Sequence, residues 1–537
     1  RGRVCLPAVG SADSTDAAPA DGRDGESDGF DAGIETDDGA DDATVDAPDP
    51  VLVVLDPGEA SDVEDPARPT GVVAAPGQEY VLILWDGGLS FWQRHDVVVE
   101  RREAGKAGPA GPRREPIVVP AAVPCLPGRF EFPGARRLAD PGPRILADPL
   151  PGDTAVFRVV VAGGSDVAEV TARLEWIGPG VEFWADRTNP FPDPAPGFYS
   201  GIARLFGGIA LPRQRFLLHD EPDVDGSGRI TVLLSPTVGD LGAAGYVNPH
   251  DLITSPYGNG KDMIYLNPPP DWFDPGWRVE YAAGVLAHEL QHLIRAGALG
   301  IDIAEAVYLN EGMSYLAADL SGFFHDVVPV LPGFLDDPGA YTVPLGIDSP
   351  SSIGVRDRRL DAVFRSGSYF VLRYLADRLG GIDVAADGTL ADGGALAFLR
   401  SQYRTDLRGM AWLEAAVGAS RRDFLPDWLT AMLLDGRGDA SGNPLPLPPR
   451  HRFADPQTDP TTGAQRGVAL NAANAYPGIG AVFLGNAVAA DLDEFDGRIP
   501  SGGIEMLRVI PESDGPVVVR IEASPGAEIG ARWVRMR

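Results

Sequence analysis

The stretch YAAGVLAHELQHLIRA, residues 281–296, decides the fold and the chemistry that this sequence predicts. Its apolar residues recur at helical spacing, so we expect one amphipathic helix over this range. His288 and His292 stand four residues apart, and positions four apart project from the same side of a helix. Two imidazoles so placed can both reach one zinc ion, and Glu289 falls where it can take a proton from a water on that ion. The alternative is two ordinary histidines on an amphipathic helix.

A catalytic zinc ion needs a third protein ligand and one open position for water. Glu311 follows His292 with eighteen residues between them, on a separate helix that we predict over 303–320. Two helices joined by a turn can bring this carboxylate against the two histidines. Glu305, which lies one to two turns earlier on the same predicted helix, is the competing candidate. We therefore predict Zn²⁺ as the cofactor, with His288, His292 and Glu311 as its ligands.

The composition of the chain limits the number of domains and the kinds of partner that we expect. The chain has 537 residues, 44% of them hydrophobic, which predicts two to four folded domains. The formal net charge of −32 disfavours nucleic acid and anionic membrane surfaces as partners, because both require Lys and Arg to neutralise phosphates. No run of about 18 apolar residues occurs, so we expect no transmembrane helix. The two cysteines, Cys5 and Cys125, are too few for a disulfide framework or a cysteine zinc site.

Changes in composition along the chain predict four regions and an α+β fold class. Residues 1–66 are rich in Asp, Ala, Gly, Ser and Pro, and predict a disordered acidic linker. Residues 67–180 contain short apolar runs between turn residues, which predict one or two β-sandwich domains. Residues 181–440 alternate strand and helix patterns and predict the catalytic domain. Residues 441–537 turn β-rich again and predict a small C-terminal domain.

The first residues of the chain bear on where the protein is found. The chain opens with Arg1 rather than Met, from which we expect a processed, secreted protein found outside the cell or at its surface. Cys5 would suit a lipid-attachment cysteine followed by an acidic tether. The residues before it, Gly2-Arg3-Val4, are unlike the small apolar residues that usually precede such a cysteine, so lipid anchoring is the minority interpretation.

The zinc motif and its surroundings resemble a known family. His-Glu-x-x-His followed by Asn310-Glu311-Gly312 resembles the thermolysin-type metallopeptidases whose third ligand is glutamate, the gluzincins. The wider sequence is similar to a secreted bacterial branch, the hyicolysin-like metallopeptidases, over roughly residues 150–435. Besides the zinc motif, the blocks that carry this similarity are Val181–Trp184, Asp223–Ile230, Asp262–Leu266 and Ser366–Phe370.

The resemblance implies a zincin-like fold, with a mostly antiparallel sheet over the zinc helix and a helical lobe behind it. It implies hydrolysis of protein or peptide substrates by a zinc-activated water, with Glu289 as the general base. A further donor should stabilise the oxyanion, and related enzymes often use a tyrosine on a later helix. Tyr369 is the candidate for that role and Tyr315, one turn after Glu311, is the rival. A packing role for both tyrosines stays open.

The segment from Asp223 to Ile230 allows two interpretations. Oxygen side chains at Asp223, Asp225 and Ser227, with Gly228 in the sixth position, match the front half of a calcium loop, which would make Ca²⁺ a second cofactor. The twelfth position is Leu234 rather than a bidentate Glu. A tight turn held by Asp side chains is the other interpretation.

Two functions of different classes remain from the sequence. The first is an active extracellular zinc endopeptidase, which the intact Glu289 favours. The second is a catalytically silent surface adhesion or binding protein that keeps a zinc-stabilised domain, which the long non-catalytic regions favour. Substrate preference and oligomeric state do not follow from the sequence.

Overall fold

The computed structural model describes most of the chain after residue 50. The described residues are 51–66, 69–76, 78–86, 94–102, 149–161, 166–271, 273–300, 307–343, 358–439, 441–476, 480–492, 495, 497–500, 502–511, 514–523 and 527–536. The predicted linker up to residue 50, both cysteines and Glu305 lie outside these residues.

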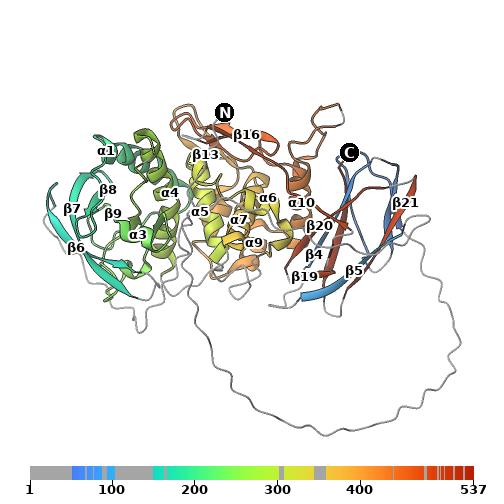
Figure 1. Ribbon diagram of the computed structural model, residues 1–537, viewed down its shortest axis with the longest axis horizontal. Coiled ribbons are helices and arrows are strands. Elements are labelled where there is room, and N and C mark those ends of the chain that lie inside the picture. Colours follow the sequence, from blue (N-terminus) through green and yellow to red (C-terminus); the bar gives the residue numbers. More distant parts are fainter. Residues whose placement is uncertain are drawn as a thin grey trace, which may run out of the picture. The chain divides into compact units, whose positions relative to one another are not determined.

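Two five-stranded sheets are built from strands at both ends of the described chain (Figure 1). One sheet has the order β1-β3-β21-β5-β19, with bounds Val51–Val53, Thr70–Ala74, Gly515–Ala523, Arg94–Arg102 and Arg498–Pro500. The other has the order β18-β20-β4-β22-β2, with bounds Ala490–Asp491, Ile504–Val509, Tyr80–Asp86, Ile529–Arg535 and Ala60–Asp62. Inward-facing residues of both sheets form one hydrophobic core, so the two sheets make a sandwich.

The strand β4 is buried on both faces because it belongs to two cores. Tyr80, Leu82 and Leu84 face the core of the sandwich, and the alternate residues Val81 and Ile83 face the helical region. Strand residues alternate between faces, so one continuous apolar run supplies both cores.

This strand pairing joins two regions that the sequence predicted to be separate domains, residues 67–180 and residues 441–537. β4 lies between β20 and β22, and β5 lies between β21 and β19, so each of these early strands has late strands on both sides. The sequence places the two groups about 400 residues apart, and local patterns carry no information about such a partner. Residues 51–66, which we predicted to be linker, also enter the sandwich through β1 and β2, because β1 pairs with β3 and Leu55 joins the core.

A six-stranded mixed sheet precedes and borders the central helices. Its order is β10-β11-β9-β8-β7-β6, with bounds Gly245–Tyr246, Met263–Leu266, Ile230–Leu234, Val181–Asp186, Val167–Gly178 and Thr154–Val160. The two pairings that involve β9 are parallel and the other three are antiparallel. β6 and β7 precede residue 180, so this sheet also crosses the predicted domain boundary. The remaining short hairpins are β12–β13 (Ile382–Val384, Leu390–Asp392), β14–β15 (Gln457–Thr458, Gln465–Arg466) and β16–β17 (Ala472–Tyr476, Gly480–Leu484).

Helices fill the region between residues 198 and 434. The longer ones are α4 (Pro275–Leu299), α5 (Val307–Leu320), α7 (Arg358–Arg378), α9 (Gly409–Val417) and α10 (Arg421–Leu434). The shorter α-helices are α1 (Phe198–Ile202), α2 (Leu211–Leu217), α3 (Pro236–Asp240), α6 (Pro332–Asp336) and α8 (Leu396–Ser401). A π-helical segment, η1 (Ala203–Ala210), joins α1 to α2, and the 3₁₀ turns are η2 (Pro249–Leu252), η3 (Phe324–Asp326), η4 (Pro338–Ala340) and η6 (Pro449–His451).

The α+β class predicted from sequence is confirmed, with a central helical region and several β-sheets. The described part of the chain contains no helix with the length and apolar character needed to cross a bilayer.

Candidate metal centre

The helix α4 has well-defined ends. The side chain of Asp274 accepts a hydrogen bond of 2.9 Å from the Trp277 amide, and Pro275 occupies the first turn, where its missing N–H costs nothing. Gly300 follows the last turn with a φ of 79°, a conformation that favours glycine. Residues 282–295 between these ends are all buried, so the middle of α4 is a core helix rather than a surface one.

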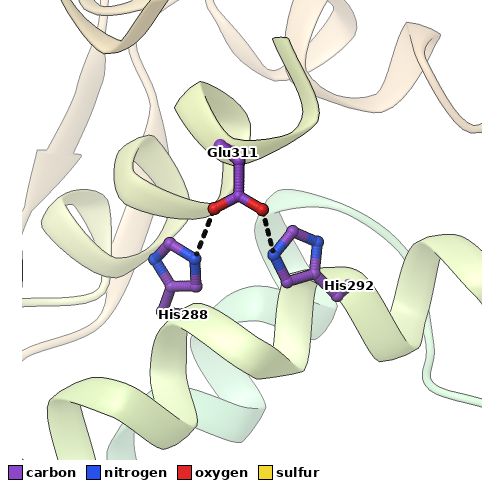
Figure 2. A group of neighbouring side chains, drawn as sticks. All are labelled: His288, His292 and Glu311. Carbon is purple, nitrogen blue, oxygen red and sulfur yellow. Dashed lines mark hydrogen bonds and ion pairs between the residues drawn. The ribbon is translucent and has the colours of Figure 1, made fainter. Parts of the chain in front are cut away.

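His288, His292 and Glu311 come together between α4 and α5 (Figure 2). Nε2 of His288 lies 3.3 Å from Oε2 of Glu311, and Nε2 of His292 lies 3.5 Å from Oε1. Four ligand atoms around a zinc ion, each about 2.1 Å from it, would be separated by about 3.4 Å in a tetrahedral arrangement. One ligand atom from each of the three side chains lies within 4.8 Å of the other two, so small adjustments of the side chains would let all three reach a single small cation.

One atom of this cluster has no other role among the described residues. Oε1 of Glu311 is buried and accepts no hydrogen bond from any residue that the structure describes. A buried carboxylate oxygen without a partner is costly, and a bound cation would satisfy it.

The protonation states also suit a cation. Burial opposes ionisation of Glu311, but Arg365 and the two histidines outweigh burial and lower its pKa to about 2. Burial lowers the pKa of His292 to about 3, against the opposing effect of Glu311. An ionised carboxylate beside a neutral imidazole is the state in which both groups bind metal.

Two neighbouring polar side chains lie beside the Nδ1 atoms of the histidines. Oδ2 of Asp326 lies 3.4 Å from Nδ1 of His288, at an ion-pair distance without hydrogen-bond geometry, and its charge would favour the tautomer that carries the proton on Nδ1 and leaves Nε2 free to bind a cation. The side-chain amide of Asn310 lies 2.9 Å from Nδ1 of His292, through its nitrogen. Rotating the amide by 180° exchanges its two ends, and Oδ1, which has no hydrogen-bond partner in the described structure, would then accept the Nδ1–H of His292.

Glu289 is fully buried and lies under the edge of the six-stranded sheet. A Cβ atom on Gly245 of the edge strand β10 would meet Cγ of Glu289 at 3.1 Å and Cγ1 of Val285 at 2.8 Å. The strand backbone therefore lies directly against the helix at the residue expected to act as the base. Only glycine allows this close approach.

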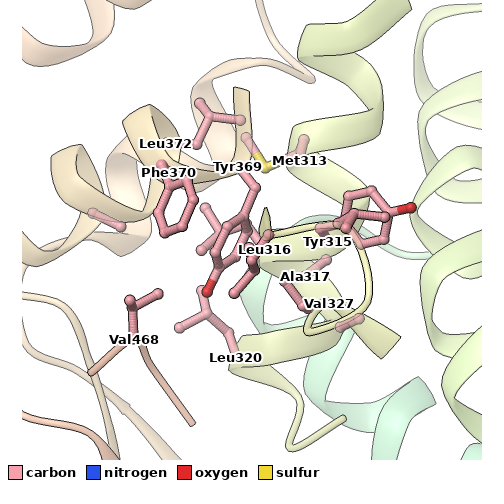
Figure 3. Packing of buried hydrophobic residues seen from close by; sticks show 14 of the residues in the cluster. Met313, Tyr315, Leu316, Ala317, Leu320, Val327, Tyr369, Phe370, Leu372 and Val468 are labelled. Atoms are coloured by element: carbon pink, nitrogen blue, oxygen red, sulfur yellow. The ribbon is translucent and has the colours of Figure 1, made fainter. Parts of the chain in front are cut away.

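Tyr369 does not reach the cluster. Its hydroxyl donates a 2.9 Å hydrogen bond to Oδ2 of Asp319, which lies eight residues after Glu311, about 12 Å farther along the helix axis. Arg373 pairs with the same oxygen at 2.7 Å. Figure 3 shows Tyr369 packed among apolar side chains, with its hydroxyl close to Leu320. These contacts support the packing role for Tyr369, not the oxyanion role that the resemblance implied.

Tyr315, the rival, lies beside the metal cluster. Its ring meets that of His288 edge to face, with centroids 4.4 Å apart. Figure 3 shows its hydroxyl directed away from Tyr369.

The predicted calcium segment forms a turn with an acidic cluster beside it. Oδ1 of Asp223 accepts from the Gly228 amide and Oδ1 of Asp225 accepts from the Ser227 amide, each at 3.0 Å. The carboxylates of Asp223 and Asp225 gather with that of Asp262, which the sequence did not identify.

The side chain of Ser227 and that of Lys261 make contacts beside this cluster. The Ser227 hydroxyl donates to the Arg229 carbonyl, and Nζ of Lys261 lies 2.6 Å from Oδ2 of Asp225, where it supplies the positive charge that a calcium ion would supply. These contacts match the Asp-stabilised turn, and calcium binding stays a prediction.

A cavity of about 310 Å³ lies beside the N-terminal half of α4. Arg204, Glu280, His325 and Thr461 line part of it, and none of the three metal-binding candidates does. The cluster itself is closed, since the most exposed of His288, Glu289, His292 and Glu311 is His292 at 5%.

Sequence reasoning missed Asp326 and Arg365. Asp326 lies in a turn 38 residues after His288, and an Asp in a turn has many other uses, so no local pattern identified it. Arg365 precedes the Ser366–Phe370 block directly, but a lone Arg on a helix predicts only a solvated side chain.

Comparison of the sequence with protein-family models and with curated proteins found no match. The case for a function therefore rests on the geometry of the cluster.

Proposed function

We propose that the chain is a secreted zinc-dependent endopeptidase of the gluzincin type. The observation that carries the proposal is the buried cluster of His288, His292 and Glu311, with spacing and protonation that suit one small cation. A zinc ion held there would supply a Lewis acid and lower the pKa of a bound water to near neutrality.

The residues of the chain divide the remaining work. His288 and His292 would offer Nε2, with Asp326 and Asn310 fixing their ring orientation. Glu289 would take the proton of the attacking water on its carboxylate and deliver it to the nitrogen of the leaving amine. The edge strand β10, whose backbone lies against Glu289, is the place where an extended peptide would add to the sheet.

The test combines metal analysis with cleavage assays on the full chain. We expect about one zinc per chain, cleavage of casein that stops on chelation, and recovery when zinc is returned. Glu289→Gln should retain zinc and the circular dichroism spectrum while losing at least about 100-fold in rate, as expected for a general base. Folded protein that takes up no zinc when supplied with it would contradict the proposed ligands.

A second candidate, the catalytically silent binding protein, is favoured by one observation. All four side chains of the centre are at least 95% buried, which restricts the access of a substrate to them. Zinc that raises the melting temperature, together with no cleavage of a broad peptide library by the wild type, would support this candidate instead.

A further inference from the structure

Arg365 places a permanent positive charge against the third candidate ligand. It lies on α7, its side chain is only 1% exposed, and Nη1 contacts Oε2 of Glu311. Its Nε donates a 2.8 Å hydrogen bond to Oδ2 of Asp361, one turn earlier on the same helix. The hydroxyl of Tyr308 donates to the other oxygen of Asp361 at 3.0 Å. The guanidinium is therefore held at both ends and cannot turn away from Glu311 without breaking buried contacts.

The helices approach closely where this contact forms. A Cβ atom on Gly312 would meet Cβ of Ser368 at 2.8 Å and the amide nitrogen of Tyr369 at 2.9 Å. The glycine after Glu311 thus lets α5 lie against the backbone of α7. That proximity brings the guanidinium within reach of the carboxylate.

The two oxygens of Glu311 have different surroundings. Oε2 contacts Arg365 and lies 3.3 Å from Nε2 of His288. Oε1 lies 3.5 Å from Nε2 of His292 and, as described above, accepts no hydrogen bond from the described residues. The guanidinium contacts Glu311 through Nη1 and Asp361 through Nε, and because its N–H groups form a rigid fork, the contact with Asp361 fixes the direction from which Nη1 reaches Oε2.

We infer that Arg365 is a positioning residue for the metal centre, which holds Oε2 of Glu311 so that only Oε1 is offered to the cation. This inference rests on the proposed zinc site. Two effects of the guanidinium oppose each other, since it repels a divalent cation but keeps the ligand ionised and oriented. Loss of a group that orients a metal ligand typically weakens metal binding 10- to 100-fold, so we expect orientation to prevail.

The experiment measures metal binding rather than activity, on the full chain. Arg365→Met removes the charge and the fork, and Arg365→Lys keeps the charge alone. Arg373→Met is the matched control, because Arg373 is a buried arginine on the same helix that pairs with Asp319, away from the cluster. For each protein we would measure the zinc Kd by competition with a chromophoric chelator, the melting temperature, and the visible spectrum after cobalt substitution.

We expect Arg365→Met to bind zinc at least about 10-fold more weakly than the wild type, with Arg365→Lys in between. Its cobalt spectrum should lose intensity, because a released Glu311 can bind with both oxygens and raise the coordination number. Arg373→Met should melt at a lower temperature but keep the wild-type Kd and spectrum.

Four outcomes would overturn the inference. Unchanged Kd and spectrum in Arg365→Met would make the arginine purely structural, and tighter zinc binding would show that repulsion prevails. If Arg365→Met does not fold, the wild type decides. A wild-type cobalt spectrum weaker than that of a four-coordinate site would show that Glu311 binds with both oxygens. A wild type that binds no zinc would refute the proposed function as well, which separates the two failures.

Discussion

Asp326 shows how a single residue can set the properties of the centre. Its carboxylate is 3.4 Å from Nδ1 of His288, and an acceptor at that position selects the tautomer that presents Nε2 to a cation. We predict that Asp326→Ala weakens zinc binding by about 10- to 100-fold, as measured by chelator competition. Asp326→Asn keeps an acceptor oxygen and should lose less. Equal zinc affinity in all three proteins would mean that Asp326 does not orient His288.

Asp262 predicts a pH dependence of stability. Burial, reinforced by the charges of Asp225 and Asp223, raises its pKa to about 8, from an ordinary value near 4. The folded state therefore binds more protons than the unfolded state between these two values. Its contribution to stability is fully present below about pH 4 and is lost as the pH rises through about 8, by at most about 1.4 kcal/mol per pH unit.

Comparison with Asp262→Asn checks this, because the variant keeps an oxygen for the Val224 amide and cannot titrate. Urea unfolding at pH 5 and pH 8.5 should show a smaller loss of stability in the variant than in the wild type. Millimolar calcium at pH 8.5 adds a test of the acidic cluster. Stabilisation of the wild type alone would support the predicted calcium ligands Asp223 and Asp225, and no stabilisation would leave the Asp-stabilised turn as the account.

At the residue scale, the sequence predicts those functional residues whose relative positions are set by the backbone of a single helix. The four-residue spacing identified His288 and His292, with Glu289 next to the first of them. Glu311 was identified because a zinc ion needs a third protein ligand. Tyr369 shows the limit of such prediction, because its helix position leaves open which neighbour its hydroxyl meets. The structure gives it Asp319, which is itself buried and paired with Arg373. Contacts between elements decide such roles, and no spacing along the chain encodes them.

At the scale of elements, α5 and α7 depend on a glycine at their contact. An added Cβ on Gly312 would lie 2.7 Å from the backbone carbon of Ser368, which cannot move alone. We predict that Gly312→Ala destabilises the protein by about 1–3 kcal/mol, since overpacking outweighs the gain of about 1 kcal/mol in helix propensity. Gly276→Ala, in the first turn of α4 with only Asp274 nearby at 3.4 Å, is the control and should be neutral or stabilising. The free energies of unfolding of both variants and the wild type would be measured by chemical denaturation. Equal stabilities of Gly312→Ala and Gly276→Ala would contradict the close contact at Gly312.

The elements themselves were largely predictable. The helix predicted over 281–296 lies within α4, and the helix predicted over 303–320 contains α5 and ends at the same residue. Helix periodicity and apolar runs involve residues that are close together in the chain, so they can be recognised from the sequence alone. The resemblance implied a mostly antiparallel sheet, and three of its five pairings are antiparallel. It did not indicate which strand pairs in parallel, and this is β9, which pairs so with both β8 and β11. Strand direction depends on connections through the whole domain, which local patterns do not record.

At the scale of the whole molecule, long-range pairs join the regions that the sequence divided. Nη1 of Arg213 contacts Oδ2 of Asp459 at 2.7 Å, and both side chains are buried. The Gly467 amide donates to Oδ1 of Asp319 at 2.8 Å. Residues beyond 440 therefore pair with buried polar groups of residues 181–440, and the composition change near residue 440 does not mark a point where the chain can be cut.

These long-range pairs predict how fragments of the chain behave. A fragment of residues 181–440 lacks β7, which pairs with β8, and leaves Arg213 and Asp319 without Asp459 and Gly467. Each broken buried ion pair costs about 3–5 kcal/mol, against a typical total stability of about 5–15 kcal/mol. We expect this fragment to show no cooperative thermal transition and to bind no stoichiometric zinc. A fragment of residues 149–476 restores these partners and should melt cooperatively, below the full chain, because it still lacks the contacts of Ile504 and Val534 with the helical core. Cooperative melting of the 181–440 fragment within a few degrees of the full chain would show that the boundaries predicted from composition are those of an independent domain.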